Sequence, residues 1–109
     1  MGNNYYYMIN GLTEKDIAQW ISVITREKII IDKHSRKRAR LRCNSEETLY
    51  EFLIDRNYNR IEKKVIDNVV KFEIYYDHPD KSIREDIKII IMPVNIREKI
   101  IRIVTVIIK

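Results

Sequence analysis

The chain of 109 residues carries a formal net charge of +5, with 45% hydrophobic and 34% charged residues and only two glycines and two prolines. This balance is typical of a folded globular domain and argues against intrinsic disorder. Its apolar runs fall short of the roughly 18–20 residues that span a bilayer, and its amino terminus lacks a secretory signal, so we expect a single cytoplasmic domain, residues 1–109, with no membrane segment.

The first predicted element is an amphipathic helix. Thr13 is a suitable N-cap because acidic residues follow it in the first turn. Apolar side chains then recur at helical spacing, which predicts a helix ending near Arg26; they are Ile17, Trp20, Ile21 and Ile24. Residues 28–32 contain three consecutive isoleucines, too few for a helix of their own, and we expect a brief extended link there.

Two more helices are predicted in the segment that follows. Residues 33–42 are basic, and their alanine, leucine and arginines favour a helix that is opened by Asp32 or Lys33. Ser45 is the expected N-cap of the next helix, because glutamates follow it directly. The apolar residues of that helix keep helical spacing, and we expect it to end between residues 55 and 57.

The carboxy-terminal half predicts strands joined by short connections. Asp67 and Asn68 provide the turn chemistry of a hairpin between the first two strands. Consecutive strands with short connections form an antiparallel meander. The last two strands have apolar residues on both faces, so they are central or lie under a partner. The expected fold is therefore α+β, with amino-terminal helices on one face of a four-stranded antiparallel sheet over residues 59–66, 69–76, 87–94 and 100–108.

The basic excess of the chain is concentrated in one short run. Between Lys33 and Arg42 there are six cationic side chains, one histidine and no acid, whereas the net charge of the whole chain is only +5. Such a concentration predicts an anionic partner, and nucleic acid is the first hypothesis.

Within this run, His34, Arg38 and Arg42 recur every four residues and would form one stripe on a helix. The positive end of the helix dipole and the neighbouring cations disfavour the imidazolium form, so His34 could accept a proton. Each arginine could hold phosphate oxygens through paired N–H donors. RNA cleavage by a ribose 2′-hydroxyl needs a general base and stabilisation of developing phosphorane charge, which this stripe could supply.

These residues resemble a known family. The spacing His34-x3-Arg38-x3-Arg42, followed by Ser45-Glu46-Glu47, is similar to the opening of a domain in the RelE/ParE superfamily, in a branch close to the BrnT-type toxins. The final strand, residues 101–106, is similar to the last strand of that family, which has an apolar-Thr-apolar pattern. The resemblance covers roughly residues 28–109 and leaves residues 1–27 as an amino-terminal extension. Cys43 departs from the family, which often has a glycine there.

The resemblance implies a compact RelE-like fold and a toxin that cleaves RNA, either on the ribosome or free, often encoded beside an antitoxin. It implies catalytic roles for His34, Arg38 and Arg42. Arg102 and the tyrosines Tyr75 and Tyr76 could face the same surface from the sheet and add cationic and aromatic side chains to it, as in RelE-like nucleases.

Each of these residues also has a simpler interpretation. His34 could be a capping or partly buried histidine. Arg38 and Arg42 could anchor the helix to the sheet through Glu46, Glu47 or an acid on a strand. Arg36, Lys37 and Arg40 would lie on other helix faces, where they either contact the nucleic-acid backbone or are only solvated. His78, in a polar loop, is a second candidate for proton transfer.

We therefore expect a metal-independent endoribonuclease of a toxin–antitoxin system. The alternatives are a non-enzymatic nucleic-acid-binding or regulatory protein that uses the basic helix, and an interaction module whose apolar sheet face binds an antitoxin or a second copy. The single Cys43 excludes an internal disulfide and suits a reducing cytoplasm. With one cysteine and two distant histidines, neither a structural zinc site nor another cofactor is expected.

Overall fold

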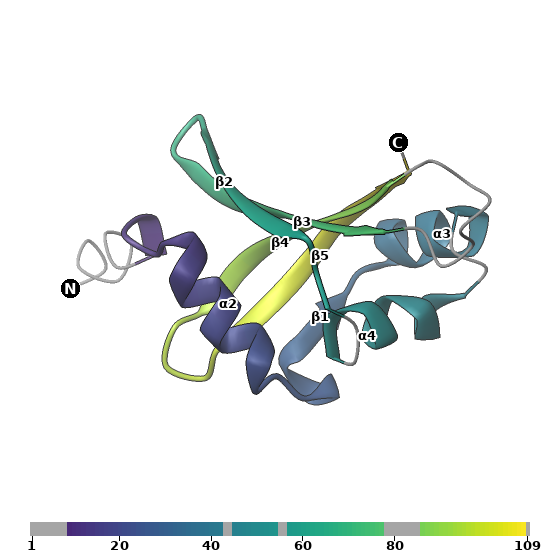
Figure 1. Ribbon diagram of the computed structural model, residues 1–109, viewed down its shortest axis with the longest axis horizontal. Coiled ribbons are helices and arrows are strands. Elements are labelled where there is room, and N and C mark those ends of the chain that lie inside the picture. The colour runs from purple at the N-terminus through teal and green to yellow at the C-terminus, as the bar shows by residue number, and fades with distance from the viewer. Residues whose placement is uncertain (1–8, 43–44, 55–56, 78–85, 109) are drawn as a thin grey trace.

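An α+β fold is formed by residues 9–42, 45–54, 57–77 and 86–108, which the computed structural model describes (Figure 1). A sheet lies above the helices in this view. In chain order the elements are α2 (Glu14–Ser22), the 3-10 helix η1 (Arg26–Lys28), β1 (Ile29–Ile31), α3 (Lys33–Arg42), α4 (Glu46–Ile54), β2 (Arg60–Ile66), β3 (Val69–Asp77), β4 (Asp86–Asn95) and β5 (Ile100–Ile108).

Within the described residues the sheet has five strands, in the order β1-β5-β4-β3-β2. Each strand from β2 to β5 is antiparallel to the next one, which confirms the predicted meander. The interior positions of β4 and β5 agree with the prediction made from their apolar residues on both faces.

The prediction of a four-stranded antiparallel sheet is wrong, because Ile29–Ile31 forms a fifth strand rather than a link. This strand, β1, pairs in parallel with β5, and its central residue Ile30 lies beside Arg102. Its two outer isoleucines are buried while Ile30 is exposed, the alternation of a half-buried strand. The partner of β1 lies far along the chain, so the local sequence contains no sign of this pairing.

The first helix begins as predicted and ends earlier. The Thr13 hydroxyl accepts a hydrogen bond from the Asp16 backbone N–H at 3.2 Å, and the Asp16 carboxylate accepts one from the Thr13 N–H at 2.8 Å. This reciprocal capping box confirms Thr13 as the N-cap. The helix ends at Ser22 instead of near Arg26, because residues 23–25 are all β-branched and have low helix propensity.

The hydrophobic core lies between the sheet and the helices on one of its faces (Figure 1). No described helix covers the opposite face, and none of the described helices is long and apolar enough to cross a membrane. The fully buried side chains with the largest volumes are Tyr76, Phe52, Phe72, Ile17, Leu49, Leu53, Ile74, Ile87, Ile89, Ile91, Ile101 and Ile103.

The hairpin of β2 and β3 extends past the rest of the sheet (Figure 1). Its turn residues Asp67 and Asn68 have φ angles of 52° and 64°, both positive as a type I′ turn requires, so the predicted turn is confirmed. Beside the turn, Val65 and Ile66 expose 56% and 66% of their surface. β2 lies at the edge of the sheet, and its end beside the turn exposes apolar side chains.

Candidate nucleic-acid interface

Asp32 fixes the start of α3. Its Oδ1 accepts a hydrogen bond from the Ser35 backbone N–H at 2.8 Å, the bond that an N-cap residue makes. Its backbone oxygen accepts from the Arg36 N–H at 3.0 Å and so begins the helical ladder. The hydrogen bond from Ser35 is the main cause that lowers the pKa of Asp32, with smaller contributions from the nearby Arg102 and His34.

Ser35 fastens α3 to the sheet. It is fully buried, with 0% of its surface exposed, and its hydroxyl donates toward the backbone oxygens of Ile103 at 2.8 Å and Val104 at 3.0 Å. The helix thus turns its small polar residue toward β5. Among the described contacts between α3 and β5, the hydrogen bonds of Ser35 anchor the helix to the sheet. The sequence had suggested Arg38 and Arg42 for this role.

The two glutamates at the start of α4 bind arginines other than those of the predicted stripe. Arg36 Nε lies 3.1 Å from Glu46 Oε2. Arg26, in η1, donates to both carboxylate oxygens of Glu47, one of these bonds measuring 2.8 Å. These pairs link η1 and α3 to α4. The acids that were expected to pair with Arg38 are thus bound by Arg26 and Arg36.

His34 and Arg38 are in direct contact on the exposed side of α3. Arg38 Nε donates a hydrogen bond to His34 Nε2 at 3.1 Å. In this arrangement Nε2 carries no proton, so a neutral ring carries its proton on Nδ1. Arg42 is the last residue of α3, one turn beyond Arg38, and its side chain lies outside the described part of the structure. The structure therefore brings two members of the predicted stripe together.

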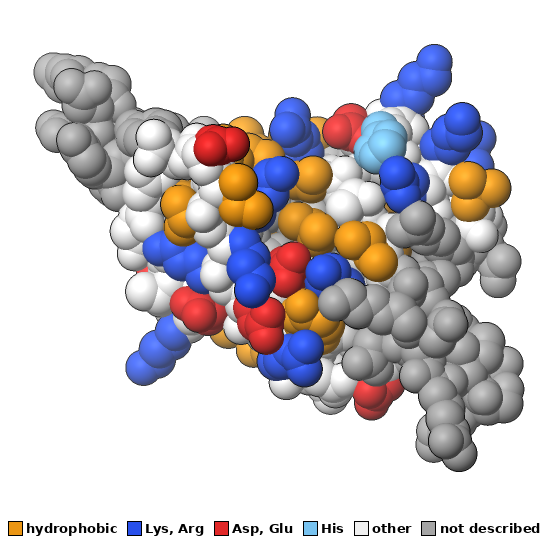
Figure 2. Space-filling view, turned by 90° about the horizontal axis from the view of Figure 1, so that it is seen from above, with side chains coloured by type: hydrophobic (Ala, Val, Ile, Leu, Met, Phe, Trp, Pro, Cys, Tyr) orange, Lys and Arg blue, Asp and Glu red, His pale blue; other side chains and the backbone are white. Residues whose placement is uncertain are grey.

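Two shallow depressions lie along the exposed surface of α3. The first, of about 320 Å³, is lined by His34, Lys37, Arg38 and Leu41. The second, of about 630 Å³, is lined by Lys33, Arg36, Lys37 and Arg40. Lys37 borders both, and Leu41, 75% exposed, adds an apolar surface among the cations. Figure 2 shows Lys and Arg side chains gathered at the end of the molecule where α3 lies.

Arg102 lies on the open face of the sheet, on β5. Its side chain is exposed, and Nη2 lies 3.8 Å from the sulfur of Met92 on β4. Arg102 also stands beside Ile30 of β1, the strand that leads into Asp32. The positive charge of Arg102 contributes to the lowered pKa of Asp32, after the larger effect of the hydrogen bond from Ser35. Arg102 on β5 and His34 on α3 thus both lower the pKa of the Asp32 carboxylate.

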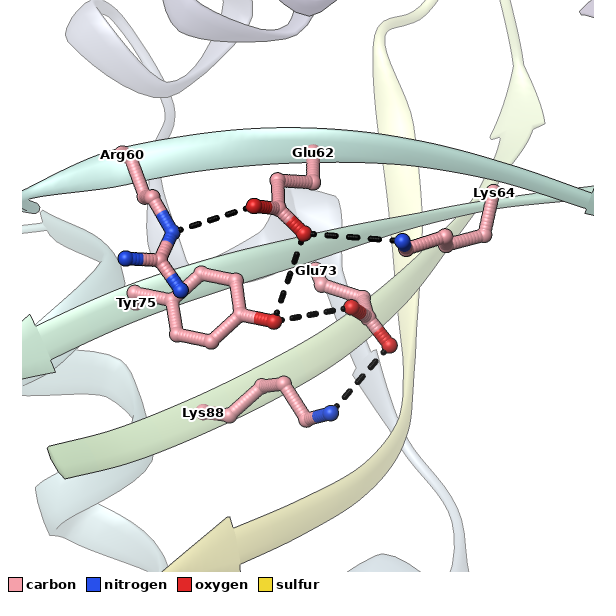
Figure 3. Close-up of polar contacts among 6 residues, drawn as sticks. All are labelled: Arg60, Glu62, Lys64, Glu73, Tyr75 and Lys88. Atoms are coloured by element: carbon pink, nitrogen blue, oxygen red, sulfur yellow. Dashed lines mark hydrogen bonds and ion pairs between the residues drawn. The ribbon is translucent and has the colours of Figure 1, made fainter. Parts of the chain in front are cut away.

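The two neighbouring tyrosines of β3 point to opposite faces. Tyr75 lies on the open face, and its hydroxyl donates to Glu73 Oε1 at 2.9 Å and approaches Glu62 Oε2 at 3.4 Å (Figure 3). Tyr76 points into the core against Phe52, so the prediction that both tyrosines share one surface is wrong. Successive side chains of a strand alternate between its faces. His78, the second proton-transfer candidate, lies outside the described residues.

A network of charged side chains surrounds Tyr75 on the open face (Figure 3). The Lys88 ammonium lies 3.3 Å from Glu73, with 10% and 14% of their side chains exposed. Burial alone would raise the pKa of Glu73, but hydrogen bonds from Tyr75 and Lys88 outweigh it and lower that pKa. The Arg60 guanidinium lies 3.9 Å from the centre of the Tyr75 ring. The charged groups around Tyr75 thus pair with one another, which is typical of a network that stabilises the sheet.

Sequence reasoning missed this network and the anchoring role of Ser35. A signal for the network was present, because charged residues recur at every second position of two consecutive strands and one more follows on the third: Arg60, Glu62, Lys64, Lys71, Glu73 and Lys88. A signal for Ser35 was weaker. It is the only small polar residue of a long cationic run, three residues after an aspartate.

Among the described residues, no group of three or more histidine, cysteine or acidic side chains is placed to hold a metal ion. The side chains of α3 offer an imidazole and several guanidinium and ammonium groups. No protein-family model, curated protein or solved structure matches this chain.

Proposed function

We propose that the protein binds RNA through α3 in the cytoplasm and cleaves it without a metal, as a toxin of the RelE/ParE type with a BrnT-like helix. The observation that carries this proposal is the 3.1 Å contact between Arg38 Nε and His34 Nε2, on a helix with six cationic residues and no acid. In the proposed mechanism the imidazole is the proton acceptor and the adjacent guanidinium binds the phosphate. The resemblance of the helix to that family adds the expectation of an antitoxin partner.

Binding is supported by the charge distribution of α3. The helix has no acid. Cationic side chains border both depressions on its surface, and Lys37 borders each of them. RNA phosphates that lie along the helix would release counterions as these cations neutralise them. Arg102, at the same sheet edge, would extend the cationic surface onto the open face of the sheet.

Cleavage follows from an exchange of partners at His34. A phosphate that takes the guanidinium of Arg38 frees Nε2 of His34, which then accepts the proton of the neighbouring ribose 2′-hydroxyl. The 2′-oxygen attacks phosphorus, the bond from phosphorus to the 5′-oxygen breaks, and the leaving oxygen takes a proton from water. The products are a 2′,3′-cyclic phosphate and a 5′-hydroxyl. Arg38, with Arg42 one turn along, stabilises the charge of the phosphorane.

The test compares the wild type with His34→Ala and Arg38→Lys on labelled single-stranded RNA, with and without ribosomes and with a chelator present. We expect His34→Ala to abolish cleavage while RNA binding, circular dichroism and melting stay unchanged, because the side chain is exposed. Arg38→Lys keeps the charge but loses the planar fork, so cleavage falls by about tenfold or more. Undiminished cleavage by His34→Ala, or no cleavage by the wild type under either condition, would refute the catalytic assignment.

A second candidate function is non-enzymatic nucleic-acid binding. It is favoured by the larger depression, which is lined by cations alone: Lys33, Arg36, Lys37 and Arg40. Here the double variant Lys37→Ala/Arg40→Ala would weaken binding and reduce its salt dependence by the equivalent of roughly two phosphate contacts. His34→Ala would leave affinity unchanged. A protein that binds RNA with this salt dependence and never cleaves it would support this candidate over the first.

A further inference from the structure

The free edge of the sheet, β2, carries charges that are opposed by like charges on β3. In the antiparallel register, Glu62 stands beside Glu73 and Lys64 stands beside Lys71. Like charges directly opposite each other destabilise a sheet. The repulsion at Glu62 is partly offset within β2, because Arg60 Nε lies 3.2 Å and Lys64 Nζ 3.6 Å from the Glu62 carboxylate (Figure 3). No described strand lies on the outer side of β2, so a strand added there can place opposite charges beside Glu62 and Lys64.

The backbone of β2 also presents unused pairing groups. The two-residue turn closes the hairpin ladder on Ile66 and Val69, and in an antiparallel pair the backbone groups of alternate residues point to the same side. The N–H and C=O groups of residues 61, 63 and 65 therefore point away from β3. No described strand lies beyond β2. Such an edge is a template for a further strand.

We propose that β2 pairs in antiparallel fashion with β2 of a second copy of this chain, in a register centred on Lys63. The backbone groups that point outward then meet, with Ile61 opposite Val65 of the second copy. On the open face, Glu62 stands opposite Lys64 of the second copy, and Lys64 stands opposite its Glu62. Across the open face, Glu73 and Glu62 of one copy are then followed by Lys64 and Lys71 of the second copy. Each like-charge pair thus gains a neighbour of opposite charge.

The charge pattern selects this register over its neighbours. A register centred on Glu62 would place the two Glu62 side chains opposite each other, and one centred on Lys64 would do the same with two lysines. In the chosen register two Lys63 residues are opposed. Each Lys63 Nζ, however, donates to the backbone oxygen of Asn10 at 2.6 Å, toward the helical side of the sheet. The ammonium groups are thus already held by other acceptors.

The two-fold pairing is closed, because each copy uses its β2 edge once. It covers Val65, which is more than half exposed in the single chain, with Ile61 of the second copy. The opposite edge of the sheet, β1, has only three residues. A closed dimer is therefore expected rather than a growing fibre. This proposal does not depend on the function proposed for α3, which lies at the other edge of the sheet.

The experiment is sedimentation of the full chain over a range of concentrations, with two charge reversals on β2. Glu62→Lys and Lys64→Glu each turn both intermolecular pairs from attraction to repulsion, so the dimer dissociation constant rises by about tenfold or more. An equimolar mixture of the two variants restores opposite charges at both positions and should form a heterodimer. The double variant Glu62→Lys/Lys64→Glu should recover the homodimer.

Glu51→Lys, an exposed charge reversal on α4, is the matched control and should dimerise like the wild type. Circular dichroism of every variant checks that the fold is intact. A wild type that stays monomeric at concentrations up to about 100 µM would overturn the proposal. So would single variants that still dimerise, or a mixture that fails to restore the dimer.

Discussion

The assignment of Ser35 as the residue that fastens α3 can be tested by Ser35→Ala. The substitution removes a fully buried hydroxyl that donates toward the backbone oxygens of Ile103 and Val104, at 2.8 and 3.0 Å. A net hydrogen bond is worth about 0.5–1.5 kcal/mol, and a buried acceptor left without a partner costs about 1–3 kcal/mol. Because one hydroxyl proton serves both acceptors, we expect a loss of about 1–2 kcal/mol in the free energy of unfolding.

For a domain of this size, that loss corresponds to a fall in melting temperature of roughly 5–10 °C. Urea and thermal unfolding followed by circular dichroism measure it. The controls are His34→Ala, at an exposed site, and Arg38→Ala, at a half-buried one, each expected to stay within about 0.5 kcal/mol of the wild type. If Ser35→Ala were neutral and either control cost more than 1 kcal/mol, the stripe and not Ser35 would fasten the helix.

Three further predictions concern other buried or capping groups. Tyr76→Phe should be neutral or stabilising by up to about 1 kcal/mol in urea unfolding, because the buried hydroxyl has no hydrogen-bond partner among the described residues. Asp32→Ala should cost about 1 kcal/mol at pH 7. The lowered pKa of Asp32 makes its carboxylate stabilising above the unfolded pKa of about 3.9, so this difference should shrink as the pH falls through the folded value. Glu73→Gln leaves the nearly buried ammonium of Lys88 without its charge partner and should cost about 1–3 kcal/mol at pH 7, again less in acid because the pKa of Glu73 is lowered too.

The meander was predictable because its signals are local. Alternation of apolar and polar residues, the Asp67-Asn68 turn and short connections determine β2 to β5 almost residue by residue. β1 was not predictable, since a three-residue strand is stabilised by a parallel partner at the other end of the chain. The end of α2 was missed because Ile24 keeps the helical spacing and is buried, although the helix stops at Ser22.

The candidate site was predicted in part. The spacing of His34 and Arg38 correctly placed both on one side of a helix, where they touch. What the spacing could not reveal is which face of α3 meets the sheet, because that depends on β5, some seventy residues away in the chain. For the tyrosines, the alternation of Phe72 and Ile74 already indicated that Tyr76 points inward. Treating the adjacent pair as one surface ignored this two-residue period.

The two proposals occupy opposite edges of the sheet, and this separation has a measurable consequence. α3 is fastened to β5 beside β1, whereas the proposed dimer forms through β2. A dimer would therefore hold two α3 helices at the two outer ends of one continuous sheet. An RNA too short to reach both helices gains nothing from dimerisation, while a long RNA binds the second helix intramolecularly.

Glu62→Lys should accordingly leave the affinity for short RNA unchanged and weaken the affinity for long RNA, by about tenfold or more. Titrations with RNAs of graded length, read by fluorescence anisotropy, would measure both effects on the same protein samples. An equal change in affinity at every length would mean that position 62 acts on RNA binding without passing through the dimer. No loss at any length, in a variant shown to be monomeric, would mean that the two helices act independently even when the dimer forms.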